Sequence, residues 1–201
     1  MLSAIILAAG ESARMGRPKA LLQWRGKCFL EHVCSALRSS GVDDRVAVLG
    51  RASSEILASW TPAGEKVAVN LKPENGQLSS LRAGLGIASE YSEAFMVCLA
   101  DQPGILPETY KKIIAFWSYH KDSIVIPRTI LTQDSRLKRG HPIIIPAAYR
   151  HLCFEAPPDK GLHWVTHHPS VKVADIEVGD SAIIRDIDTP GDYESFLRTE
   201  A

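Results

Sequence analysis

Short apolar runs rich in β-branched residues alternate with amphipathic stretches along the first two thirds of the chain. Continuous apolar runs are typical of buried strands, whereas apolar residues three and four positions apart indicate one face of a helix. In the stretch 29–41, Leu30, Val33, Cys34 and Leu37 have helical spacing and a glycine closes the segment. Because such segments alternate, we expect an α/β fold with a parallel sheet and helices on both faces. The predicted strands are 4–9, 45–50, 66–70, 94–101 and 123–128, and the predicted helices are 29–41, 53–60, 77–91 and 107–120.

The alternation weakens in the last third of the chain. Residues 129–140 are polar and predict a surface loop or a lid. Because no internal repeat or low-complexity linker divides the chain, we expect one domain over residues 1–201, with some antiparallel structure in this last part. The other elements predicted here are a strand and then a helix in 141–152, a late strand at 171–178, and a turn that caps a final helix in 186–197.

The charge balance limits the classes of partner. Lys and Arg together number 23, as do Asp and Glu, so the formal net charge is zero. No global field attracts nucleic acid or an anionic membrane, so any anion site must be local. No apolar run approaches the length of a membrane span, and the start of the chain lacks the basic segment of a signal peptide. The four cysteines show no zinc spacing and are expected to be reduced and buried, which fits a cytoplasmic protein.

A flexible cationic loop follows the first predicted strand. It begins at Gly10 and carries Arg14, Arg17 and Lys19. Ligands of open parallel sheets bind at the carboxyl ends of the strands, where glycine lets backbone N–H groups approach a phosphate. Arginine and lysine can bind phosphate oxygens, but the loop is neither a Walker loop, which needs Lys-Ser where Arg17-Pro18 stand, nor a G-x-G-x-x-G fingerprint. From residue types alone, an ordinary basic surface loop stays the alternative to a triphosphate site.

The complete string LAAGESARMGRPK, residues 7–19, resembles the signature L-A-[AG]-G-x-[SG]-x-R-M-G-x-x-K of nucleotidyltransferases that activate sugars, isoprenoid precursors and pterins. Its Ala-Ala-Gly and Pro-Lys are most similar to the molybdenum cofactor cytidylyltransferases of the MobA/MocA-like NTP transferase family. The resemblance implies a three-layer, Rossmann-like nucleotidyltransferase fold of the GT-A-like type. Residues 1–128 would bind the nucleotide and residues 129–201 the acceptor. The nucleotide-binding residues that it implies in this loop are Leu7, Ala8, Ala9, Gly10, Arg14 and Lys19, of which Arg14 and Lys19 are also catalytic.

A second segment, ENGQLSSLRAGL at 74–85, combines a turn with a helix start. Taken alone it is an ordinary helix start, although bare amides there can bind an anion or a base edge. It also resembles the G-x-S-S-S-[LI]-R-x-G segment of the cytidylyltransferases, which implies that Gly76, Ser79 and Ser80 contact the nucleotide. Leu78 departs from the Ser or Met that is commoner at its position.

Acidic residues supply the expected metal ligands. Asp101 ends an apolar run, and magnesium prefers one or two carboxylates together with phosphate oxygens. The segment resembles the family's [LG]-x-D-Q-P, which implies that Asp101 is the principal Mg²⁺ ligand and a catalytic residue; a turn cap is the alternative. Asp186 or Asp188 could complete the site, and Asp188 is preferred. Its rival role is the N-cap of the final helix, for which Thr189 competes.

The string RGHPIII at 139–145 resembles a Gly-His-Pro motif of the pterin-transferring subgroup. This implies that Gly140 and His141 line the acceptor site, whereas a lone histidine is more often structural. The implied reaction transfers CMP from CTP to the phosphate of molybdopterin cofactor, with release of pyrophosphate. GTP, a sugar phosphate or another small phosphate could replace these substrates, and a molybdoenzyme could receive the product. A cofactor-delivery chaperone and a nicotinamide-dependent oxidoreductase are the alternatives from other classes.

Overall fold

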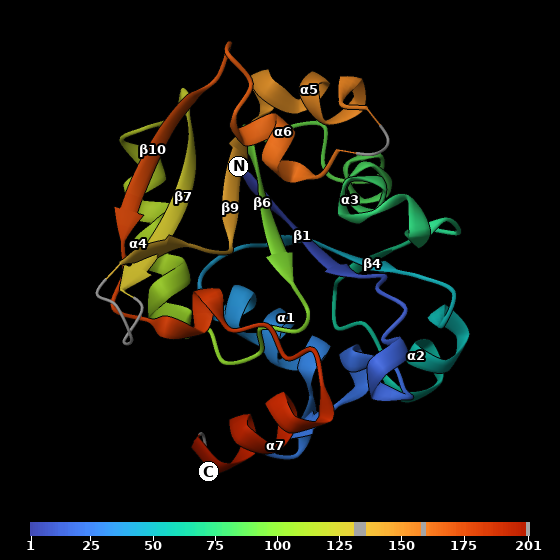
Figure 1. Cartoon of the computed structure of the whole chain (residues 1–201). Coiled ribbons are helices and arrows are strands. Elements are labelled where there is room, and N and C mark those ends of the chain that lie inside the picture. The colour runs from blue at the N-terminus through green and yellow to red at the C-terminus, as the bar shows by residue number, and fades with distance from the viewer. Residues whose placement is uncertain (131–135, 158–159, 200–201) are drawn as a thin grey trace.

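The computed structural model of the chain describes residues 1–130, 136–157 and 160–199. Within these residues, eight strands form one mixed sheet in the order β10-β7-β9-β6-β1-β4-β5, with β8 paired to β7, and β2 and β3 form a separate hairpin (Figure 1). The strands are β1 Leu2–Ala8, β2 Gln23–Trp24, β3 Lys27–Cys28, β4 Asp44–Leu49, β5 Lys66–Val69, β6 Ala94–Leu99, β7 Ser123–Ile130, β8 Leu137–Arg139, β9 Ile143–Pro146 and β10 Lys172–Glu177. The α-helices are α1 Phe29–Ser39, α2 Ser53–Ser59, α3 Gln77–Leu85, α4 Pro107–Ser118, α5 Arg150–Glu155, α6 Leu162–Thr166 and α7 Pro190–Thr199.

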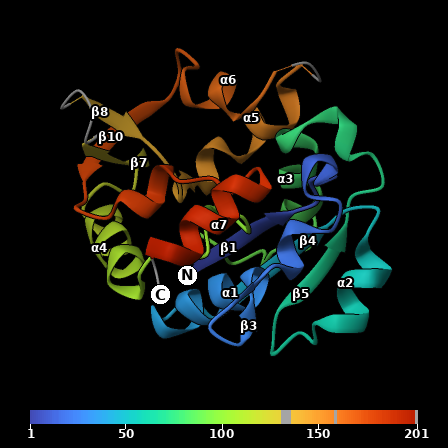
Figure 2. The same cartoon turned by 60° about the horizontal axis from the view of Figure 1, so that its bottom comes forward.

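Helices cover both faces of the sheet and make three layers. Helices α1 and α4, with Ile56 of α2, pack their apolar side chains on one face. Helices α3, α5 and α6 pack on the other face, as the turned view in Figure 2 shows. Strand residues such as Ile5 and Ile6 alternate between the two clusters, and both are fully buried. This two-sided burial explains why the strands of the sheet centre are continuous apolar runs.

The order of strands contains a topological switch point beside β1. Strand β1 pairs in parallel with β4 on one side and with β6 on the other. The chain runs outward from β1 through β4 to β5 and then returns to form β6, so adjacent connections leave β1 in opposite directions. A crevice forms at the carboxyl ends of strands at such a point, where open α/β sheets bind ligands. The residues that follow β1, β4 and β6 therefore border one potential site.

Helix α7 returns the end of the chain to this same edge of the sheet. Phe196 packs edge-on against Phe29 of α1 and Trp24 of the β2–β3 hairpin, and Tyr193 Oη donates a hydrogen bond of 2.6 Å to the Gln23 carbonyl. The helix lies beneath the carboxyl ends of the central strands in Figure 1 and crosses in front of them in Figure 2. The residues just before α7 are thereby brought to the ends of β1 and β6.

The predicted fold class is confirmed, and so is antiparallel structure in the last third. Strand β9 pairs antiparallel with both β6 and β7. The expected reduced cysteines are also present, since all four are buried free thiols. In the described part of the chain, no helix is long and apolar enough to cross a bilayer. The single-domain prediction stays a prediction.

Two predicted segments differ from the structure. The loop predicted at 129–140 is wrong at both ends, because β7 continues to Ile130 and residues 137–139 form β8 against it; residues 131–135 lie outside the described residues. All three β8 side chains are exposed, so backbone pairing leaves no apolar signal there. The helix predicted at 77–91 ends at Leu85, where Gly84 and Gly86 lower helix propensity. The hairpin β2–β3 and helix α6 are too short for a periodic pattern to predict.

Gly84 marks the closest approach of helix α3 to the sheet. A Cβ at this position would lie 2.4 Å from Ile5 Cγ2 and 2.8 Å from Val48 Cγ2. We therefore expect Gly84→Ala to lower the free energy of unfolding by about 1–3 kcal/mol through overpacking. Urea unfolding would measure the change, with Gly179→Ala as the control because a Cβ there meets nothing within 4 Å. Equal stability of the two variants would contradict this packing.

Candidate active site

A cavity of about 740 Å³ lies at the carboxyl ends of β1, β4 and β6. This volume falls in the range of small-molecule sites, which is about 300–1,000 Å³. Its walls come from the end of β1 and the loop that follows, from Gly50 and Arg51 after β4, and from Asp101 after β6. The residues predicted to bind nucleotide or metal that line it are Leu7, Ala8, Ala9, Gly10, Arg14, Lys19, Asp101 and Asp188. The cavity thus brings together residues from both ends of the chain.

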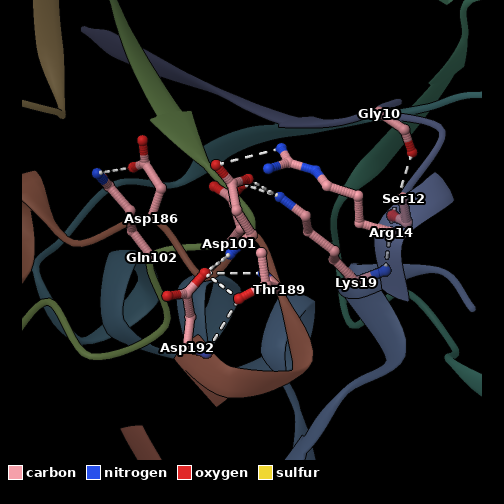
Figure 3. A network of polar contacts seen from close by, with 10 residues as sticks. Gly10, Ser12, Arg14, Lys19, Asp101, Gln102, Asp186, Thr189 and Asp192 are labelled. Carbon is pink, nitrogen blue, oxygen red and sulfur yellow. Dashed lines mark hydrogen bonds and ion pairs between the residues drawn. The ribbon is translucent and has the colours of Figure 1, made fainter. Parts of the chain in front are cut away.

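Ser12 organises the loop after β1. It has a left-handed backbone with φ 51°, and its Oγ accepts a hydrogen bond of 3.0 Å from the Lys19 N–H. The carbonyl of Ser12 accepts a 2.8 Å bond from the Met15 N–H, which begins a short 3-10 turn over Ala13–Met15. These bonds fold the loop back on itself, so that Arg14 and Lys19 both reach toward the end of β6 (Figure 3). Residue-type reasoning gave Ser12 no role, although it stands at the [SG] position of the signature.

Two cations and two acids meet in this cavity. Lys19 Nζ lies 2.9 Å from Asp101 Oδ2 and also forms an ion pair with Asp188. Arg14 Nη2 lies 3.6 Å from Asp188 Oδ2. The Lys19 side chain is 17% exposed and that of Asp101 23%, whereas Arg14 is 68% exposed. Lys19 is therefore held in the wall of the cavity, whereas most of the Arg14 side chain is exposed to solvent.

The electrostatics of the pair follow from its burial. Burial raises the pKa of Asp101, and the neighbouring Lys19 ammonium opposes that rise. Burial alone would lower the pKa of Lys19, but Asp101 and Asp188 together raise it. The ammonium of Lys19 therefore stays charged at neutral pH and stands as a cation between two carboxylates.

Asp101 and Asp188 both pair with the Lys19 ammonium, so the question is whether a divalent metal fits the same position. No group of three or more His, Cys, Asp or Glu side chains that could hold a metal occurs among residues 1–130, 136–157 and 160–199. Magnesium needs no such group when substrate phosphates complete its shell, and it often has one or two carboxylates. Two carboxylates that already share a cation fit that requirement.

Asp188 and Asp186 have different surroundings. Asp188 lines the cavity, whereas Asp186 is absent from its described lining and accepts a 2.8 Å hydrogen bond from Gln102 Nε2. The rival role of Asp188 as a helix cap belongs to Thr189. Thr189 Oγ1 accepts from the Asp192 N–H at 3.2 Å, and Asp192 Oδ2 accepts from the Thr189 N–H at 2.8 Å, which is the reciprocal pattern of a capping box. Of Asp188, only the backbone N–H takes part, donating to Asp192 Oδ2 at 3.2 Å, so its carboxylate is not used by the cap.

The serines predicted to bind nucleotide are not among the described lining residues of the cavity. Asn70, just after β5, donates from Nδ2 to Ser79 Oγ at 2.8 Å and to Ser80 Oγ at 3.0 Å. Ser80 is buried, and Leu78 packs in the core with 2% of its surface exposed. Gly76 has φ 82° and is the N-cap residue just before helix α3. The Leu78 side chain thus faces the core, and the role of Gly76, Ser79 and Ser80 stays a prediction.

Gly140 and His141 also stand outside the described lining of this cavity. The His141 N–H donates to the Ile183 carbonyl at 2.9 Å, and a Cβ on Gly140 would lie 2.0 Å from that same oxygen. The His141 Nε2 is buried and has no hydrogen-bond partner within the described ranges. These contacts give both residues a packing role. Their place in the acceptor site stays a prediction.

His141 should make stability depend on pH. Burial lowers its pKa from 6.5 to about 4, and the nearby Asp186 charge opposes this only in part. Because the unfolded chain binds the proton more tightly, stability is full above pH 6.5 and falls as the pH drops from 6.5 toward 4. Over that window we expect the wild type to lose up to about 3 kcal/mol more than His141→Gln. Urea unfolding between pH 7.5 and 4 measures this, and parallel pH curves for the two proteins would contradict it.

Arg51 is a further cavity residue that sequence reasoning missed. Its guanidinium lies 2.6 Å from Glu11 Oε1 and 2.9 Å from Glu74 Oε2. It thereby links the loop after β1 to the turn before α3 across the rim of the cavity. Its place directly after a predicted strand was the one signal that could have found it.

Comparisons with known proteins agree with this geometry. The profile of the MobA-like NTP transferase domain matches residues 4–172. Nicotine blue oxidoreductase of Paenarthrobacter nicotinovorans is 32% identical over 149 residues, which cover 73% of this chain and 71% of that protein. A probable molybdenum cofactor guanylyltransferase of Bacillus cereus is 27% identical over 123 residues, and the match covers 60% of this chain and 59% of that protein.

Solved structures resemble the chain over nearly its whole length. The crystal structure of Rv0371c from Mycobacterium tuberculosis H37Rv superposes with a TM-score of 0.84 and 27% identity, covering 98% of this chain and 97% of that one. The same protein has been solved in complex with manganese, with a TM-score of 0.81 and 26% identity. A homologue of the chain therefore binds a divalent metal.

Proposed function

We propose that this chain, which belongs to the MobA-like NTP transferase family, transfers CMP from CTP to the phosphate of molybdopterin cofactor and releases pyrophosphate. One observation carries the proposal: Arg14 and Lys19 of a glycine-containing loop meet Asp101 and Asp188 in a cavity at the switch point of the sheet. Cations suit the phosphates, and the acids suit a metal that accompanies them. The Bacillus guanylyltransferase, named for the molybdenum cofactor, supports the acceptor. The Ala-Ala-Gly and Pro-Lys of the loop favour CTP.

The chain's own residues would act by positioning and by stabilising charge. An acceptor phosphate oxygen attacks the α-phosphorus in line while pyrophosphate leaves, and such transfers need little covalent chemistry from the protein. Backbone N–H groups near Gly10 would hold the triphosphate, and Arg14 and Lys19 would stabilise the charge that develops on the departing pyrophosphate. No general base is required, because a phosphate nucleophile is already ionised near neutral pH.

Asp101 and Asp188 would hold Mg²⁺. When bound, the ion supplies Lewis-acid stabilisation of charge on the triphosphate. Lys19, which pairs with both carboxylates in the structure, would then pair with phosphate oxygens instead. The manganese complex of Rv0371c, which has a similar fold, supports the use of a divalent ion by this chain.

The remaining assignments form part of the same proposal. The nucleotide would bind to residues 1–128, with Gly76, Ser79 and Ser80 near its base or ribose, and the acceptor to residues 129–201, with Gly140 and His141 near it. A molybdoenzyme would receive the product in the cytoplasm.

The main alternatives differ in substrate or in class. A GTP-using enzyme, or one that acts on a sugar phosphate or another small phosphate, would use the same four charged residues. A cofactor-delivery chaperone would bind ligand without turnover. One relative is named as an oxidoreductase, nicotine blue oxidoreductase, so NADH and NADPH should also be tested as substrates.

Mass analysis of the reaction product separates these alternatives. The protein would be incubated with Mg²⁺, molybdopterin cofactor and each nucleoside triphosphate in turn. We expect a cofactor species that has gained CMP, formed with CTP and absent without protein. A GMP adduct would move the specificity to GTP. Binding without any adduct would favour the chaperone. In a parallel incubation with NADH or NADPH and an added dye as electron acceptor, oxidation of the reduced nucleotide would favour the oxidoreductase.

A further inference from the structure

We propose that Gln102 and Asp186 form a positioning pair that fixes Asp188 beside Asp101, and that Asp186 is not itself a metal ligand. The inference rests on the proposed function, because it concerns the metal site of that reaction. Gln102 follows Asp101 directly in sequence, and Asp186 lies two residues before Asp188. The pair therefore connects the two segments that carry the proposed metal ligands.

The Gln102 side chain makes this connection from a buried position. It is 2% exposed, and its single Nε2 donates both to Asp186 Oδ1 at 2.8 Å and to the Ile183 carbonyl at 3.1 Å. Figure 3 shows the hydrogen bond between this side chain and Asp186. Both residues lie on the side of Asp101 that is opposite Lys19 and Arg14. One amide group thus uses both of its hydrogens to hold the segment that leads to Asp188.

Backbone hydrogen bonds hold the same segment at neighbouring points. The Ile187 N–H donates to the Asp101 carbonyl at 3.1 Å, and the His141 N–H donates to the Ile183 carbonyl at 2.9 Å. Ile187 itself is buried against the aromatic cluster under α7. Contacts at residues 183, 186 and 187 therefore fix the chain just before Asp188 and limit where its carboxylate can lie.

The orientation of Asp186 argues against a role as ligand. Its Oδ1 is occupied by the Gln102 amide, and the residue is absent from the described lining of the cavity that includes Asp188. Asp188 instead has its carboxylate on Lys19 and Arg14. Two residues that alternate along an extended segment could face the same way, but here one carboxylate anchors the segment and the other faces the cavity.

The chemistry of the pair depends on an amide donor. Gln102→Glu keeps the size of the side chain but removes both donors and places a carboxylate against Asp186 and a carbonyl. Residues that orient metal ligands commonly affect metal affinity by about 10- to 100-fold. We therefore expect Gln102→Glu to weaken Mn²⁺ binding by about tenfold. Asp186→Asn keeps an oxygen acceptor for Gln102 and should leave Mn²⁺ affinity within about twofold, whereas Asp186→Ala should weaken it about as much as Gln102→Glu.

The test is a titration with Mn²⁺ alone, followed by electron paramagnetic resonance of the free ion, on these variants and on Asp188→Asn. Hydrogen exchange of the Ile187 amide gives a second readout, and it should become faster in Gln102→Glu and Asp186→Ala but not in Asp186→Asn. If Gln102→Glu does not fold, the two Asp186 variants are sufficient for the test, because Asp186 is exposed and its replacement should not prevent folding. An Asp186→Asn protein that loses as much Mn²⁺ affinity as Asp188→Asn would overturn the proposal, as would wild-type affinity in folded Gln102→Glu and Asp186→Ala. No nucleotide or acceptor is present, so failure of CMP transfer would leave this result readable.

Discussion

Asp101→Asn should lower the rate of nucleotidyl transfer by about a thousandfold while leaving the protein folded, since loss of several kcal/mol of charge stabilisation corresponds to such a factor. The carboxylate is largely buried at the end of β6, where it faces the cavity and Lys19. An amide of the same shape cannot supply the negative charge that a divalent ion needs. Turnover with CTP and cofactor, measured at saturating Mg²⁺, would give the size of the loss.

The stability of the same variant separates chemistry from folding. Burial raises the pKa of Asp101, which means that its charged form is disfavoured where it lies. Replacing it with a neutral amide should therefore not lower the thermal midpoint. Asp122→Asn serves as the matched control, because Asp122 is exposed and paired with Lys172 away from the cavity. Turnover like that of the wild type in folded Asp101→Asn would remove Asp101 from the site.

Lys19→Ala should weaken binding of CTP by about 10- to 100-fold, since a hydrogen bond to a charged group contributes about 1.5–3 kcal/mol. The expected loss is smaller for CMP, because the lysine is assigned to the β- and γ-phosphates that CMP lacks. Calorimetric titration with CTP and with CMP measures both affinities. Equal losses for the two nucleotides would contradict the placement of Lys19 on the terminal phosphates.

Removing the Lys19 ammonium has a second consequence. In the structure it lies between Asp101 and Asp188, the position that a metal would share with it. Mn²⁺ alone should therefore bind more tightly to Lys19→Ala than to the wild type. Lys27→Ala is the control for both effects, because Lys27 is an exposed lysine that pairs with Glu31 on α1.

The parts of the site that are local in sequence could be predicted. Gly10, Arg14 and Lys19 lie within ten residues and follow a clear apolar strand, so the sequence predicts that their loop lies at the edge of the sheet. Asp101 ends another such strand. Asp188 is different, because it is 169 residues away from Lys19, and the docking of α7 that joins them depends on long-range packing of Phe196 and Ile187. Only a resemblance could pair these residues beforehand.

The contacts that were missed depend on tertiary structure. Ser12 shapes its loop through a left-handed backbone conformation. Arg51 forms ion pairs with residues of two separate loops. Gln102 donates hydrogen bonds to a carbonyl and a carboxylate that lie more than eighty positions further along the chain. No periodic pattern records such contacts. The prediction of a loop at 137–139 was wrong for a related reason. Strand β8 forms there by backbone pairing, and its side chains are all exposed.

Pyrophosphate release is the direct test of whether this protein transfers CMP from CTP to molybdopterin cofactor. The assay contains the protein, Mg²⁺, molybdopterin cofactor and one of the four nucleoside triphosphates at a time, with Asp101→Asn as the inactive control. We expect release with CTP that requires the cofactor and is lost in the variant. Release with another nucleotide would keep the mechanism but change the substrate. No release with any of the four, although CTP binds, would contradict the proposed transfer reaction.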